Sequence, residues 1–124
     1  MTLKIGIFGT GSVAKRNYIP CLAGQQDVEL GYYNRTRAKA NAVAAEFGGE
    51  IFESPAALAA WSPDAIFVLT RETERLATAQ TLLELKPRRL FFEKPLVAAQ
   101  GQEDVREEDF VNARALLQQA AAQD

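Results

Sequence analysis

The sequence contains no histidine and a single cysteine, Cys21. These absences exclude imidazole metal ligands, histidine general bases and Ser-His or Cys-His pairs within the 124 residues. One thiol cannot form an internal disulfide, and without a Cys-x-x-Cys motif we interpret Cys21 as a helix-packing residue. We therefore expect no metal site, and any chemistry must use Lys, Arg, carboxylate or Tyr side chains or a bound cofactor.

The sequence also lacks an excess of one charge and any long apolar run. Fourteen basic and sixteen acidic residues give a net charge of −2, which is too balanced to attract a nucleic-acid backbone. No apolar run approaches the roughly 20 residues of a membrane-spanning helix, and residues 1–4 lead into a strand pattern instead of a signal peptide. We predict a soluble, cytoplasmic protein with no nucleic acid and no membrane as partner.

The length and composition favour one domain. A chain of 124 residues is the size of an ordinary domain, and its 48% hydrophobic content is enough to form a core without disulfides or metals. We therefore predict a single domain over residues 1–124.

Strand and helix patterns alternate along the chain. Short apolar runs bounded by glycine, proline or polar residues predict strands over 3–8, 28–33, 51–52, 65–70 and 89–92. Helical spacing and capping residues predict helices over 12–22, 37–47, 55–60 and 72–85, and a last helix with an apolar stripe from Phe110 to Ala120. Parallel strands need crossover connections, so the predicted fold is α/β, a doubly wound Rossmann-like parallel sheet with helices on both faces. In such sheets ligands lie beyond the carboxyl ends of the strands.

Several residues predict where elements begin and end. Ser12, Thr36 and Ser54 are expected to cap helices, and Gly48-Gly49 to end one. Residues 98–124 are expected to form a connector and the last helix, with the acidic stretch up to Asp109 as a solvated loop.

A glycine-rich segment lies between the first strand and the first helix. Residues 9–14, Gly-Thr-Gly-Ser-Val-Ala, match the Gly-x-Gly-x-x-Gly/Ala fingerprint of dinucleotide-binding folds. The first glycine permits a tight turn, the second lets a pyrophosphate approach the backbone, and the final alanine lets the helix pack on the strand. The candidate cofactor-binding residues here are Gly9, Thr10, Gly11, Ser12, Val13 and Ala14. The alternative is a helix-entry turn that binds nothing.

The end of the second strand carries cations where dinucleotide folds usually place an acid. Asn34 occupies that position and Arg35-Thr36-Arg37 follow it. A carboxylate would repel a 2′-phosphate, whereas asparagine and arginine offer neutral and cationic donors to it. We therefore expect NADP(H) to be preferred over NAD(H). The alternative is a solvated helix start.

The tripeptide Glu93-Lys94-Pro95 ends the fifth strand. A lysine at this edge of the sheet can face a nicotinamide and a substrate oxygen, although a strand-end surface lysine is also common.

These motifs together, with the strand Ala65–Thr70 (AIFVLT), resemble the N-terminal nucleotide-binding domain of the glucose-fructose oxidoreductase / inositol dehydrogenase / rhizopine catabolism (Gfo/Idh/MocA) oxidoreductases. The resemblance covers residues 3–97. It implies that Lys94 positions or polarises the substrate hydroxyl and that Glu93 lies beside the nicotinamide. It also adds Leu69, Thr70 and Arg71, at the end of the fourth strand, to the cofactor-binding set.

The sequence departs from the family pattern in three places, one of which is the stretch over residues 98–109, longer and more acidic than the usual connection. Family members usually follow the fourth strand with Thr-Pro and, a few residues later, a histidine, where this chain has Arg71 and Arg75. The family also adds another strand and a second α/β domain after the last helix, and that domain holds most of the substrate pocket and another catalytic group. We therefore expect this polypeptide alone to be inactive as an enzyme.

The function implied is that of an NADP(H)-binding domain. In the full-length protein it would serve hydride transfer between the nicotinamide cofactor and a sugar- or polyol-like hydroxyl or carbonyl. One alternative is a stand-alone, non-catalytic module that senses a nucleotide or docks a protein, and another is a degenerate domain that binds no nucleotide. The last helix and one sheet edge are expected to expose apolar surface and to favour self-association into a homo-oligomer.

Overall fold

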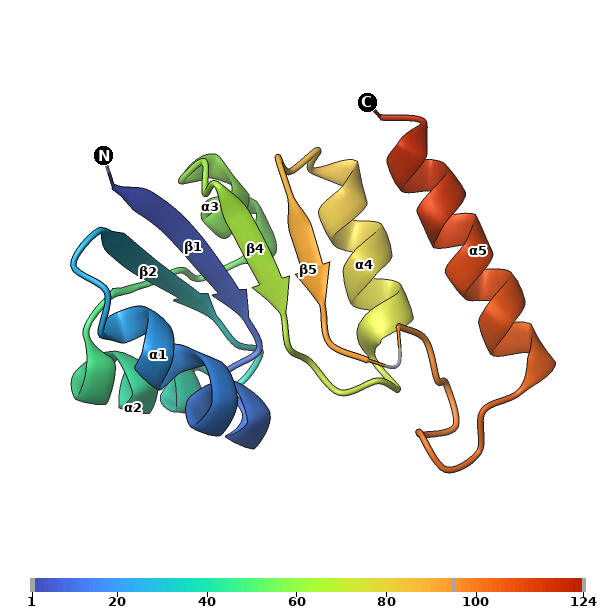
Figure 1. The fold of residues 1–124 in the computed structure, drawn as a ribbon, viewed down its shortest axis with the longest axis horizontal. Coiled ribbons are helices and arrows are strands. Elements are labelled where there is room, and N and C mark those ends of the chain that lie inside the picture. Colours follow the sequence, from blue (N-terminus) through green and yellow to red (C-terminus); the bar gives the residue numbers. More distant parts are fainter. Residues whose placement is uncertain (1, 95, 124) are drawn as a thin grey trace.

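A computed structural model describes residues 2–94 and 96–123, so Pro95 of the Glu-Lys-Pro motif lies outside the described residues. Within these ranges one parallel sheet has the strand order β3-β2-β1-β4-β5 (Figure 1). The strands are β1 (Leu3–Phe8), β2 (Val28–Tyr33), β3 (Glu50–Ile51), β4 (Ala65–Val68) and β5 (Leu90–Phe92). The predicted doubly wound α/β fold is confirmed.

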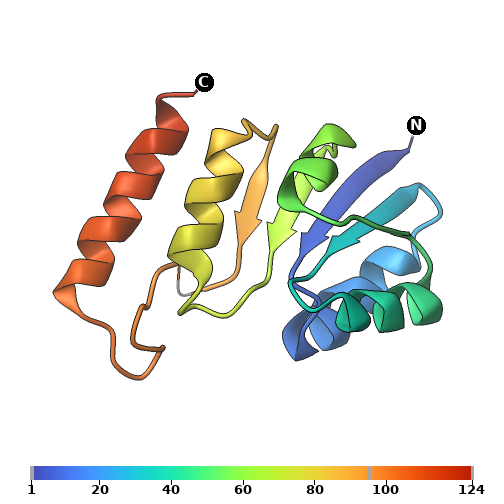
Figure 2. The ribbon, with the colours of Figure 1, turned by 180° about the vertical axis from the view of Figure 1, so that it is seen from behind.

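Helices cover both faces of this sheet. They are the π-helical segment η1 (Ala14–Tyr18), which continues into α1 (Ile19–Ala23), then α2 (Arg37–Phe47), α3 (Pro55–Ala60), α4 (Arg75–Glu84) and α5 (Glu107–Ala121). Figure 2 shows α3 and α4 in front of the strands, and both views place α5 outermost, beside α4. The connections after β1, β2 and β4 therefore meet at one edge of the sheet, where the strands end.

The alternation of side chains along each strand divides the core into layers. Ile5 and Ile7 of β1 pack with Leu30 and Tyr32 of β2 beneath η1, α1 and α2. On the opposite face Phe8 of β1 packs beneath α3 and α4 in a second cluster with Leu58, Ile66, Val68 and Leu82. A third cluster joins α4 to α5 through Ala79, Leu83, Val97 and Leu116. Apolar layers on both faces hold the carboxyl edge of the sheet in place.

The ends of several elements differ from the sequence predictions by one to three residues. β4 ends at Val68 instead of Thr70, and α4 begins at Arg75 instead of Glu72. The difference arises because the backbone after β4 turns away from the sheet, and its Thr70 carbonyl accepts a hydrogen bond from the Arg75 side chain.

The capping predictions have mixed outcomes. The Ser54 hydroxyl accepts a hydrogen bond from Ala57 N at 3.0 Å, as predicted. Ser12 is itself helical, and the Gly11 carbonyl accepts the bond of that turn from Lys15 N at 3.0 Å. Thr36 does precede α2, but its side chain makes no capping bond.

The acidic connector is not wholly solvated, which corrects the sequence prediction. Asp109 is buried, and its carboxylate accepts hydrogen bonds from Ala99 N at 3.0 Å and Arg106 N at 2.9 Å. The bonds from Arg106 and Ala99 hold the pKa of this carboxyl below its usual value. Asp109 therefore ties the chain that follows the Glu-Lys-Pro motif to the start of α5.

We predict that Asp109→Asn lowers the melting temperature at neutral pH, because an amide can accept only one of these two bonds through its oxygen. The folded pKa lies below the unfolded value of about 3.9, so the stabilisation is complete above that pH and is lost as pH falls through the folded pKa. The difference in Tm between the wild type and the variant should therefore shrink below about pH 4. Thermal unfolding over a pH series measures it, with the exposed Glu108→Gln as control. A pH-independent difference would contradict this role.

Three surface features complete the fold. Cys21 is exposed, so its prediction as a helix-packing residue was wrong. Phe110, Val111 and Leu117 of α5 are more than half exposed, and self-association through them stays a prediction. No helix in the described ranges has the length and apolar character needed to cross a membrane.

Candidate functional site

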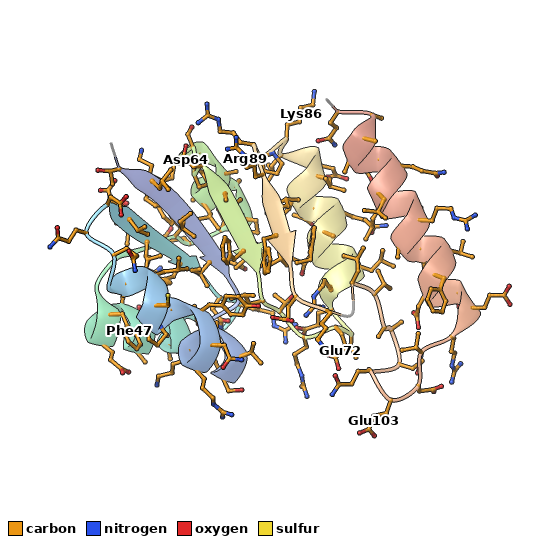
Figure 3. The ribbon with its side chains drawn as sticks, in the orientation of Figure 1. Phe47, Asp64, Glu72, Lys86, Arg89 and Glu103 are labelled. Atoms are coloured by element: carbon orange, nitrogen blue, oxygen red, sulfur yellow. The ribbon has the colours of Figure 1, made fainter. Side chains whose placement is uncertain are left out.

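A cleft of about 470 Å³ lies at the carboxyl edge of the sheet, between the connections that follow β1, β2 and β4. It is lined by Phe8, Gly9, Gly11, Tyr33, Asn34, Arg35, Thr36, Lys39, Leu69, Thr70, Arg71, Glu74, Ala77 and Thr78. Figure 3 labels Glu72 near this edge and Asp64 and Arg89 at the opposite one. A second groove, between α4, α5 and β5, contains none of the site residues that the sequence predicts. The cleft at the carboxyl edge is therefore the candidate site.

The first glycine of the loop occupies a position that only glycine fits. Gly9 has a φ of 101°, in the left-handed region, and a Cβ there would lie 2.9 Å from Thr70 N. Its N–H donates to the Tyr33 carbonyl at 2.8 Å. At the other end of the loop Ala14 is fully buried in the core, against the sheet. The loop is thus held closely between β2 and the end of β4.

The second glycine faces open space instead. A Cβ on Gly11 would meet nothing within 4 Å, and the helix begins at the next residue. N–H groups at a helix start have no partner within the helix. The hydroxyls of Thr10 and Thr70 are buried and have no hydrogen-bond partner among residues 2–94 and 96–123. Free backbone donors, unpaired hydroxyls and open space fit the pyrophosphate of a dinucleotide.

Asn34 fastens two loops of the cleft together. Its Oδ1 accepts a hydrogen bond from Thr10 N at 3.0 Å, and its Nδ2 donates to the Thr36 carbonyl at 2.9 Å. The sequence predicts Asn34 as a donor to the cofactor, and the structure adds that its amide joins the glycine loop to the start of α2. This link fixes the spacing between the loop after β1 and the loop after β2, which line the same cleft.

The cations predicted after β2 have different surroundings. Arg35 lines the cleft, and its Nη2 lies 2.9 Å from Glu74 Oε1 on the opposite side. Arg37 pairs with Glu53 at 3.3 Å and does not line the cleft, whereas Lys39 does. Successive side chains of a helix are rotated by about 100° around its axis, so Arg37 and Lys39, which are two positions apart, point in different directions.

The carboxylate of Glu93 is held by hydrogen bonds from two directions. The Tyr18 hydroxyl, from the end of η1, donates to Oε2, and Lys94 N donates to Oε1 at 3.1 Å. The Tyr18 bond, the Lys94 backbone bond and the nearby Arg75 charge lower the pKa of Glu93, and the same hydroxyl–carboxylate bond raises the pKa of Tyr18. Glu93 is therefore ionised and oriented near neutral pH. The Lys94 residue itself is exposed.

Arg75 connects the loops that follow β4 and β5. The residue is only 2% exposed, and its guanidinium donates to the carbonyls of Thr70 and Glu93. Burial lowers the pKa of this guanidinium, while the charges of Glu72 and Glu93 act in the opposite direction. Arg75 thus places the Glu93-Lys94 segment relative to the cleft.

The sequence predictions and the cleft overlap only in part. Eight of the predicted residues line the cleft: Gly9, Gly11, Asn34, Arg35, Thr36, Leu69, Thr70 and Arg71. The other predicted residues do not: Thr10, Ser12, Val13, Ala14, Arg37, Glu93 and Lys94. Sequence reasoning missed Tyr18 and Glu74. A π-helical segment interrupts the 3.6-residue spacing, so no apolar pattern indicated where Tyr18 points.

A comparison with known protein families assigns the chain. The model of the Gfo/Idh/MocA proteins, described as "Oxidoreductase family, NAD-binding Rossmann fold", matches residues 3–118. The chain belongs to this oxidoreductase family. The match extends past residue 97, where the resemblance seen in the sequence ends, and includes the connector and most of α5. No curated protein matches the chain.

Three solved structures share the fold of this chain. KijD10, a 3-ketoreductase from Actinomadura kijaniata in complex with NADP and TDP-benzene, has 22% identity and a TM-score of 0.77, and the match covers 99% of this chain and 35% of that one. UDP-N-acetylglucosamine 3-dehydrogenase GnnA from Acidithiobacillus ferrooxidans has 23% identity and a TM-score of 0.79, with 99% and 35% covered. A Gfo/Idh/MocA family oxidoreductase from Vibrio cholerae has 22% identity and a TM-score of 0.81, with 98% and 36% covered. The chain thus spans about a third of the length of these structures.

Proposed function

We propose that this chain is an NADP(H)-binding domain, residues 1–124, that serves hydride transfer in a Gfo/Idh/MocA oxidoreductase. The observation that carries the proposal is the cleft at the carboxyl edge of the sheet, which is lined by Gly11, facing open space, and by Thr70, whose buried hydroxyl has no partner within the described residues. The nicotinamide, when bound, supplies the hydride donor or acceptor. The family match and the NADP complex of KijD10 support a nicotinamide dinucleotide as the ligand.

We assign the pyrophosphate to the glycine loop, Gly9 to Ala14, at the start of the first helix. The adenosine half then lies beside Asn34, Arg35 and Thr36, with Lys39 and Tyr33 bordering the same side. Arg37, which pairs with Glu53 and does not line the cleft, would reach the adenosine phosphate only by leaving that ion pair. Leu69, Thr70 and Arg71 border the cleft across from these residues. Three of the cations here, Arg35, Lys39 and Arg71, line the cleft and favour the 2′-phosphate of NADP(H) over the hydroxyl of NAD(H).

We assign the nicotinamide end to the Glu93-Lys94 segment, with Lys94 as the catalytic residue that holds the substrate oxygen. The substrate class is a sugar- or polyol-like hydroxyl or carbonyl, in line with the sugar-nucleotide dehydrogenase activity in the name of GnnA. Proton transfer and substrate positioning require further groups, so we propose that the isolated chain does not turn over substrate.

One observation favours a second candidate, a non-catalytic nucleotide-sensing or protein-interaction module. Arg75, which stands at the usual histidine position of the family, is buried and donates to two backbone carbonyls, so its side chain serves the fold. A module of this kind would bind the dinucleotide without catalysing a reaction.

The cofactor assignment predicts that Arg35→Asp weakens NADPH binding by about 10- to 100-fold, since one charge-assisted hydrogen bond contributes about 1.5–3 kcal/mol. NADH has no 2′-phosphate, so its affinity should change little. Calorimetric titration with both dinucleotides measures the effect, and Arg114→Asp on α5 makes the same charge change away from the cleft. An unchanged NADPH/NADH preference in Arg35→Asp would refute the NADP(H) assignment.

A further inference from the structure

One ion pair spans the candidate cleft. Arg35, in the loop after β2, and Glu74, the residue before α4, line it from opposite sides, with Nη2 and Oε1 2.9 Å apart. The Arg35 side chain is 83% exposed and that of Glu74 is 39% exposed, so both can reach a ligand from solvent. The cation predicted to hold a 2′-phosphate is therefore already paired with a carboxylate.

Glu74 is the only acidic residue among those that line the cleft in the described ranges; the other charged lining residues are Arg35, Lys39 and Arg71. Its carboxylate forms no capping bond at the start of α4, where only its backbone takes part, accepting from Thr78 N and donating to Arg71 O. The start of α4 therefore does not depend on a hydrogen bond to this carboxylate. The carboxylate pairs instead with Arg35.

We infer that Glu74 is a specificity-determining residue that competes with the 2′-phosphate of NADP(H) for Arg35. The inference rests on the proposed dinucleotide function. For a phosphate with nearly two negative charges to pair with Arg35, the ion pair between Arg35 and Glu74 has to break. The Glu74 carboxylate then lies near the phosphate and repels it. A ribose hydroxyl is neutral and meets no such competition. Glu74 thus reduces the preference for NADP(H) that Arg35 provides.

The test uses 2′,5′-ADP and 5′-AMP, which isolate the phosphate subsite from the nicotinamide end. Glu74→Gln keeps the size of the side chain and should tighten 2′,5′-ADP binding by about three- to tenfold, with 5′-AMP affinity unchanged. The gain should shrink as salt is added, because the groups are exposed. Glu46→Gln removes a carboxylate from an ion pair with Lys15 outside the cleft and should leave both affinities unchanged. In an Arg35→Gln background, the gain from Glu74→Gln should be smaller.

The possible results distinguish a failure of the proposed competition for Arg35 from a failure of the proposed dinucleotide function. If the wild type binds NADPH but Glu74→Gln binds 2′,5′-ADP no tighter than Glu46→Gln does, the competition is refuted and the dinucleotide function stands. Weaker 2′,5′-ADP binding by Glu74→Gln refutes it as well, because Glu74 would then be holding Arg35 in place for the phosphate. If the wild type binds neither NADPH nor 2′,5′-ADP, the proposed function fails and the inference fails with it.

Discussion

Replacing Gly11 with alanine is expected to weaken NADPH binding by about 10- to 100-fold while the protein stays folded, because the methyl group keeps a phosphate from the backbone N–H groups and at least one charge-assisted hydrogen bond is lost. Gly11 lies outside the left-handed region, and its added Cβ meets no protein atom within 4 Å. The free energy of unfolding should therefore be unchanged or raised by up to about 1 kcal/mol. Calorimetric titration and urea denaturation measure the two quantities.

Gly9→Ala is the matched control, because the same methyl group, added two residues earlier, should lower the stability of the fold. Its Cβ would lie 2.9 Å from Thr70 N, at a φ of 101° that alanine rarely adopts. This variant should lose at least about 1–2 kcal/mol of stability. If Gly11→Ala bound NADPH as tightly as the wild type, the glycine loop would not be the pyrophosphate site.

Arg75→Met should lower the free energy of unfolding by about 2–4 kcal/mol, because it leaves two partly buried carbonyls without donors, at about 1–2 kcal/mol each. These carbonyls belong to Thr70 and Glu93, in the loops after β4 and β5. The variant should also bind NADPH more weakly, since Thr70 lines the cleft. Urea denaturation monitored by circular dichroism measures the stability.

Arg71→Met provides the comparison, since Arg71 is an exposed arginine four residues earlier in the same connection. Its stability should stay within about 0.5 kcal/mol of the wild type. Equal stabilities for the two variants would show that the buried guanidinium does not hold the loops together. If Arg75→Met does not fold, Arg75→Lys offers a milder change, because an ammonium can still donate to one of the carbonyls.

The fold could be predicted from the sequence because its signals are local. Continuous apolar runs such as Ala65–Val68 mark strands covered on both faces, and Gly48 with its φ of 78° ends α2 where the sequence indicated. The parallel orientation of the strands then follows from the helical crossover connections between them, whereas the strand order β3-β2-β1-β4-β5 is known from the structure. The match to the oxidoreductase family agrees with this prediction over residues 3–118.

The candidate site was only partly predictable, because its remaining contacts join residues distant in the sequence. The hydrogen bond from Tyr18 to Glu93 spans 75 positions and depends on a π-helical segment. Asp109 looked like one of several solvated acids, but two backbone N–H groups make it a buried acceptor. Arg75 was recognised as standing at the histidine position of the family, whereas its role in joining two loops required the structure.

Calorimetric titration of the wild-type chain with NADPH and with NADH, at one moderate salt concentration, tests the central claim most directly. The salt must be fixed because the proposed phosphate contacts are electrostatic and screened by ions. The dinucleotide function predicts saturable binding with one site per chain, with NADPH bound more tightly than NADH. If neither dinucleotide binds, the open space at Gly11 is not a cofactor site, and the function of the chain must be sought among protein-interaction modules.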